Sequence, residues 1–191
     1  MEWSDKVAVI TEITRKKMTE AHLLNVYEWL QTTDFFTAPA SIHYHGVYPG
    51  GLLIHSYQVY LLLREWSKRL DIQWERDRSP LVIGLLHDVC KIGAYEKITT
   101  EDGRDVYVYN KEHDRKYEDN HGLLSVQMLT NSGLIQLTDE ERICIRYHMG
   151  TFTRDLNPDL GDLSYSEMLN KYPNLLWTHT ADMYASQIMK N

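Results

Sequence analysis

Apolar residues recur every three or four positions along most of the chain, which is the spacing of one helix face. This pattern predicts helices over Ser4 to about Gln31, Leu52–Leu70, Ser79 to Cys90 or Lys91, His121–Asn131, Thr138–His148 and Asn174–Ile188, with a short helical turn at Ser164–Leu169. Between Tyr95 and Asn110 the pattern changes to alternation, and Asp102-Gly103 in the middle is a hairpin turn signal. The fold class predicted is therefore all-α in the main, with one small β-hairpin.

The ends of several predicted helices carry capping signals. Ser4 or Asp5 could cap the first helix, and Pro80 suits the first turn of the third. Thr138 followed by Glu141 is a capping box. A polar loop is expected over Thr151–Asp162, ahead of the last two helical stretches.

Composition limits the class of protein. The 191 residues are 43% hydrophobic and 25% charged, without a repeat or low-complexity tract, which suits one domain with one core. The formal net charge of -7 does not attract long nucleic acids. Both cysteines lie in apolar helical patterns, as expected of buried thiols in a reducing compartment. No secretory signal and no membrane-spanning stretch is evident, so we expect a cytoplasmic protein without a membrane partner.

Histidine and aspartate residues stand among the apolar residues of five predicted helices. They are His55, His87, Asp88, His121, His148 and Asp182. A buried carboxylate is costly without a partner, and a bound cation is one remedy. Helical bundles build metal sites from facing helices, and imidazole with carboxylate suits Fe, Mn, Co, Ni or Zn better than Ca. A single histidine on an apolar face is more often hydrogen-bonded core than ligand, so the interpretation depends on the whole set.

The ordered set His55, His87-Asp88 and Asp182 resembles the HD-domain superfamily of metal-dependent phosphohydrolases. The segment GGLLIHSYQV resembles the first helix of that family, LLHDVCKIG resembles its HD helix, and ADMYAS resembles its last ligand segment. The resemblance covers about residues 42–187 and indicates a single domain over 1–191, in which residues 1–33 form an N-terminal helical extension. Cys90 departs from the common HD-x-G-K form, whereas Lys91 is retained.

The resemblance implies a metal centre. His55, His87, Asp88 and Asp182 would hold a first ion, and His121 and His148 match the contexts of the extra ligands in two-metal members. The cofactor expected is one or two divalent transition-metal ions. Asp88 would bridge the ions and orient the water, and a metal-activated hydroxide would hydrolyse a phosphate ester. The substrate class implied is a nucleotide or a short, nucleic-acid-like phosphate ester.

Three further residues are candidates for contact with that substrate. Lys91 would act catalytically by reaching a phosphate oxygen or pairing with Asp88, although a lysine favoured by the helix dipole is an equal explanation. His45 is a candidate for substrate contact, and Arg146 for a phosphate clamp. A loop histidine and a helix-surface arginine would explain these two equally simply.

Two other functions stay open at this point. Some HD-fold proteins use a di-iron pair to activate O2, and six His and Asp ligands would permit that chemistry. A non-catalytic module that binds a nucleotide is the other alternative. The substrate, the metal and the oligomeric state do not follow from the sequence.

Overall fold

The computed structural model describes residues 3–111, 121–131, 133–153 and 162–189. Its α-helices are α1 (Trp3–Glu20), α2 (Leu24–Gln31), α3 (Gly51–Leu70), α4 (Ser79–Leu86), α5 (His121–Asn131), α6 (Asp139–Arg146), α7 (Tyr165–Lys171) and α8 (Leu175–Gln187). Two 3-10 turns, η1 (Val89–Lys91) and η3 (Gly150–Phe152), and the strands β1 (Tyr95–Thr99) and β2 (Asp105–Tyr109) complete the described elements. The predicted fold class, helical with one hairpin, is confirmed.

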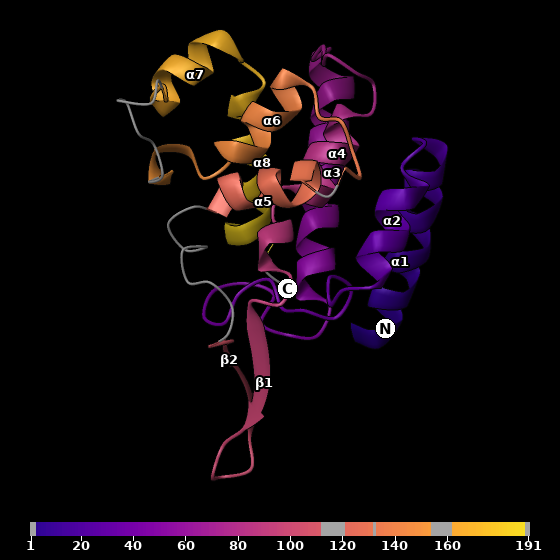
Figure 1. The fold of residues 1–191 in the computed structure, drawn as a ribbon, viewed down its shortest axis with the longest axis vertical. Coiled ribbons are helices and arrows are strands. Elements are labelled where there is room, and N and C mark those ends of the chain that lie inside the picture. The colour runs from indigo at the N-terminus through magenta and orange to yellow at the C-terminus, as the bar shows by residue number, and fades with distance from the viewer. Residues whose placement is uncertain (1–2, 112–120, 132, 154–161, 190–191) are drawn as a thin grey trace.

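Helices α3 and α4 pack against each other at the centre of the molecule (Figure 1). Helices α1 and α2 lie on one side of α3, and α5, α6 and α8 lie on the other, while the hairpin projects away from the helices. The α3–α4 contact is close because Gly84 has no side chain: a Cβ there would lie 2.4 Å from the Cα of Tyr60. The core fills the space between the layers with residues such as Leu53, Leu63 and Ile83.

The N-terminal region differs from the single helix predicted over Ser4 to Gln31. The chain breaks after Glu20, where His22 takes a left-handed conformation with φ 57°. The Leu23 N–H then donates to the Met18 carbonyl at 2.7 Å, which closes α1 and turns the chain into α2. Both Met18 and Leu23 are buried, so the break turns two apolar faces toward one core. Ser4 and Asp5 lie inside α1 and are not its cap.

Two helices that precede candidate ligands, α4 and α6, also end earlier than predicted. Helix α4 stops at Leu86, and Asp88 leaves the helical conformation with φ -109° and ψ 18° before the η1 turn. Helix α6 stops at Arg146, two residues before His148. These ends place His87, Asp88 and His148 at helix termini, where adjacent side chains diverge more than they do along a helix.

Other predictions from the pattern hold. The hairpin pairs Tyr95 with Tyr109 and turns at residues 100–104, α5 has the predicted bounds, and the Thr138–Glu141 capping box is present. Most of the predicted polar loop, residues 154–161, lies outside the described residues. Within the described part of the chain, no helix has both the length and the apolar character of a membrane span. The single-domain assignment with an extension over residues 1–33 remains a prediction.

Candidate metal centre

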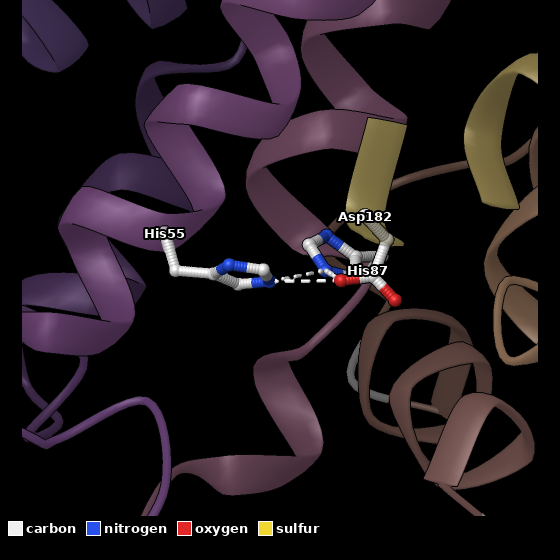
Figure 2. A group of neighbouring side chains, drawn as sticks. All are labelled: His55, His87 and Asp182. Carbon is white, nitrogen blue, oxygen red and sulfur yellow. Dashed lines mark hydrogen bonds and ion pairs between the residues drawn. The ribbon is translucent and has the colours of Figure 1, made fainter. Parts of the chain in front are cut away.

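Three predicted ligands meet between α3, the end of α4 and α8, as Figure 2 shows. The Nε2 atom of His55 lies 3.1 Å from Oδ1 of Asp182 and 3.3 Å from Nε2 of His87. His87 Nε2 lies 3.9 Å from the same aspartate oxygen. One donor atom from each residue lies within 4.8 Å of the other two, which is the spacing that permits a shared ion.

The Asp88 carboxylate joins this group to a second one. Its Oδ2 lies 3.5 Å from Nε2 of His87 and 3.6 Å from Nε2 of His55. Its Oδ1 lies 2.7 Å from Nε2 of His121 and 3.5 Å from Nε2 of His148. The two oxygens of one buried carboxylate therefore face two different sets of imidazoles.

Backbone carbonyls fix which ring nitrogens point at Asp88. Nδ1 of His87 lies 3.0 Å from the Gly84 carbonyl oxygen, and Nδ1 of His148 lies 2.7 Å from that of Ile145. A carbonyl only accepts, so each Nδ1 carries the hydrogen and the Nε2 of a neutral ring is an acceptor. Acceptor nitrogens thus face the acceptor oxygens of Asp88, and Nε2 of His148 is buried without a hydrogen-bond partner.

The electrostatics of the centre favour a bound cation. Burial lowers the pKa of His87 to about 3, which keeps this ring neutral at neutral pH. Burial alone would raise the pKa of Asp88, but Lys91 and the histidines hold it well below its usual value, so the carboxylate is ionised. Burial disfavours the protonated form of His148, whereas the adjacent Asp88 carboxylate favours it. The net effect raises the pKa of His148. The centre therefore holds an ionised carboxylate against a neutral His87 ring, an arrangement that a bound cation would stabilise.

Lys91 forms an ion pair at the edge of the centre. Its Nζ lies 2.7 Å from Oδ2 of Asp88, and both side chains are buried. Burial disfavours the charged amine, yet the adjacent carboxylate raises the pKa of Lys91 above its usual value. The Lys91 ammonium is thus paired with the Asp88 carboxylate, which is one of the arrangements predicted for it, and does not extend into solvent.

A cavity of about 560 Å³ opens over the centre. Its lining includes Asp88, His121 and Asp182 from the centre, together with Lys91 and His45. The His45 ring lies 4.6 Å from that of His55, and both of its nitrogens are buried without a hydrogen-bond partner. The structure therefore brings His45 and Lys91 to the same space as the candidate ligands.

Arg146 is not placed at this cavity. Its Nη2 lies 3.1 Å from Oδ2 of Asp162, and the guanidinium stacks 5.6 Å from the ring centre of Tyr147. Because α6 ends at Arg146 and the chain then turns, His148 points inward while Arg146 pairs elsewhere. The proposed phosphate clamp has no support in this geometry.

Some residues near the centre are not among the predicted ligands and substrate contacts. Nδ1 of His179 lies 2.7 Å from the carbonyl oxygen of His148, and its ring packs on Gly150, which fixes the segment that carries His148. Tyr95 and Tyr109 of the hairpin line the cavity, which their alternation alone did not indicate. Cys90 approaches Asp88 and His121, but burial raises the pKa of its thiol and keeps it protonated.

Comparison with known proteins gives one finding of similarity. The family model described as HD domain matches residues 52–173 of the chain, which include His55, His87, Asp88, His121 and His148. Asp182 lies beyond the matched range. No curated protein and no solved structure matches the chain.

Proposed function

The chain belongs to the HD domain family, whose members are generally metal-dependent phosphohydrolases, and we propose that this protein is one of them. One observation carries the proposal. The unprotonated Nε2 atom of the neutral His87 ring faces Oδ2 of Asp88 at 3.5 Å, and two acceptors that meet in this way repel each other until a cation lies between them.

The residues divide naturally between two ions. His55, His87 and Asp182 with one oxygen of Asp88 would hold the first, and His121 and His148 with the other oxygen would hold the second. The donor set suits Fe, Mn, Co, Ni or Zn. When bound, such ions supply hydroxide at neutral pH and neutralise charge on phosphoryl oxygens.

The remaining cavity residues suit an anionic ester. The Lys91 ammonium holds Asp88 in place and lines the cavity, where it would also attract a phosphate oxygen. His45, at the cavity wall beside His55, would contact the substrate. Exposed Tyr44 and Phe152 offer faces for a base, and about 560 Å³ suits a nucleotide or a short phosphodiester.

A hydrolysis screen tests this proposal. Metal-stripped protein is reloaded separately with each of the five metals and assayed on nucleotides, phosphomonoesters and short phosphodiesters. We expect metal-dependent hydrolysis that is lost in Asp88→Asn and retained in Asp105→Asn, a matched change at an exposed aspartate of the hairpin. Consumption of O2 by the iron form without ester hydrolysis would favour the oxygenase alternative, and nucleotide binding without turnover would favour a binding module. Either result would overturn the proposal.

A further inference from the structure

A second cavity, of about 600 Å³, lies between α1, α3 and the segment that joins α3 to α4. Its lining shares no residue with that of the cavity over the metal centre. His55 lies in the second turn of α3 and Lys68 in its last, so these two residues are about 20 Å apart along that helix. The volume falls in the range of small-molecule sites. We refer to this space as the basic cavity.

Positive charge dominates the basic cavity. Lys17, Arg64, Lys68 and Arg78 line it, against Glu20 and Asp77. Lys17 Nζ forms an ion pair with Oε2 of Glu20 at 2.9 Å, so these two charges neutralise each other. In the described part of the chain, no carboxylate forms an ion pair with Arg64, Lys68 or Arg78. An excess of cations in one cavity of a chain with net charge -7 points to an anionic ligand.

Arg78 has an unmet hydrogen-bond donor at the wall of this cavity. Its Nη1 donates to the carbonyl of Ala21 at 3.3 Å, in the break between α1 and α2. Its Nε is buried and has no hydrogen-bond partner. A buried donor of a charged group is costly when it is left unpaired, and the Arg78 guanidinium, which lines the cavity without a carboxylate partner in the described part of the chain, would be stabilised by an anion there.

Aromatic and apolar side chains form the rest of the lining. Tyr60 and Leu81 are buried, and Trp74 is held by its Nε1–H, which donates to Oγ of Ser67 at 2.7 Å. The same hydroxyl donates to the carbonyl of Leu63 at 2.6 Å, so the indole is fixed to α3. A flat ring could stack on the fixed indole, and negative groups attached to that ring could pair with the adjacent basic side chains.

We propose that the basic cavity binds a nucleotide-like ligand, with its phosphates at Arg64, Lys68 and Arg78 and its ring against Trp74. The histidine and aspartate set of the metal centre is absent from the described lining, so this is a binding site and not a second place of hydrolysis. The inference does not depend on the function proposed for the metal centre.

Isothermal titration calorimetry with ADP tests this site. The full chain is kept metal-free with excess chelator, which separates the result from metal-dependent binding at the other cavity. The test variant is Arg64→Gln/Lys68→Gln, and both residues are exposed, so folding is preserved. The control is Lys16→Gln/Arg69→Gln, which removes the same charge at exposed positions outside the cavity. We expect the Kd for ADP to rise at least about tenfold in the test variant, about 1.4 kcal/mol, and to stay unchanged in the control.

Further arms separate the phosphate from the ring. Trp74→Ala is expected to weaken ADP binding and to leave binding of inorganic tripolyphosphate unchanged, and Arg78→Gln is expected to weaken both. No binding of ADP at about 1 mM, or equal weakening in the test and control variants, would overturn the site. Tripolyphosphate binding as tight as that of ADP in the wild-type protein would overturn the part of the proposal that concerns the ring.

Discussion

The cavity over the metal centre and the basic cavity differ in the sign of the charge that would complete them. Around Asp88, buried nitrogens and oxygens converge as acceptors and leave room for cations. In the basic cavity, guanidinium and ammonium groups outnumber the carboxylates and leave room for anions. The metal centre includes His55 of α3, and Arg64 and Lys68 of the same helix line the basic cavity. Each region has a buried polar atom without a hydrogen-bond partner, Nε2 of His148 at the metal centre and Nε of Arg78 at the basic cavity. A buried acceptor without a partner thus indicates a cationic ligand nearby, and a buried donor without a partner indicates an anionic one.

One contact links the two regions. Tyr60 lines the basic cavity, and its backbone lies against Gly84 of α4. The carbonyl of Gly84 in turn holds Nδ1 of His87. The packing of α3 on α4 therefore supports both the wall of one cavity and the orientation of a candidate ligand in the other.

The largest effect is expected from neutralising a carboxylate at the metal centre. Asp182→Asn removes the charge of a proposed ligand of the first ion, and we expect kcat/KM for ester hydrolysis to fall by at least about 10–100-fold, the loss usual even for a partner of a metal ligand. Asp162→Asn is the matched control, because Asp162 pairs with Arg146 away from the cavity. Equal activity of Asp182→Asn and the control would remove Asp182, which lies outside the family match, from the centre.

Removal of the metal comes next in size. An ion that binds only the folded state at 100 times its Kd adds about 2.7 kcal/mol to the free energy of unfolding. We expect a chelator to lower the thermal unfolding temperature of the wild-type protein and to leave that of Asp88→Asn unchanged. An identical response of the two proteins would argue against binding at Asp88. ADP should stabilise both of them, since the basic cavity is separate.

The contact between α3 and α4 offers a test of the link. Gly84→Ala would place a Cβ within 2.7 Å of three Tyr60 atoms, and overpacking of this kind costs about 1–3 kcal/mol of unfolding free energy. Metal affinity should fall as well, because the carbonyl that orients His87 moves. Chemical denaturation and metal titration measure the two effects. A variant with wild-type stability and metal affinity would show that this contact is not tight in solution.

Salt should produce the smallest effect and should separate the cavities. Raising the salt concentration from about 0.1 M to 1 M shortens the screening length from about 10 Å to 3 Å. Because Arg64 and Lys68 are exposed, ADP affinity at the basic cavity should fall severalfold. The metal centre should be affected less, because Asp88 is buried and interactions of buried charges are screened less by salt. Equal salt dependence in calorimetric titrations of ADP and metal would contradict this contrast.

The metal centre could be proposed from the sequence because each ligand belongs to a recognisable local pattern. His55 lies on an apolar helix stripe, and His87-Asp88 closes an apolar run, so each position pointed inward without knowledge of the fold. The helix ends were misplaced because apolar spacing continues through residues 87–91, while the backbone leaves the α-conformation at Asp88. Arg146 pairs with Asp162 after the same kind of helix end, and its role as a phosphate clamp stays a prediction.

The basic cavity could not be found in this way. Its cations come from α1, α3 and the segment before α4, and no short stretch of sequence contains them together. The cavity also depends on the break at His22, which the spacing did not predict, because Ala21 supplies the carbonyl that holds Arg78. Sites of this kind arise from packing between distant segments and need the fold to be known.

Elemental analysis after loading with Mn tests the metal centre most directly. Wild-type protein, Asp88→Asn and Arg64→Gln/Lys68→Gln are loaded, desalted and measured side by side. We predict one or two ions per chain in the wild-type protein and in the basic-cavity variant, and a loss of bound metal in Asp88→Asn. Metal-free wild-type protein, or equal metal content in Asp88→Asn, would contradict the assignment of Asp88 as the carboxylate that gathers the ions.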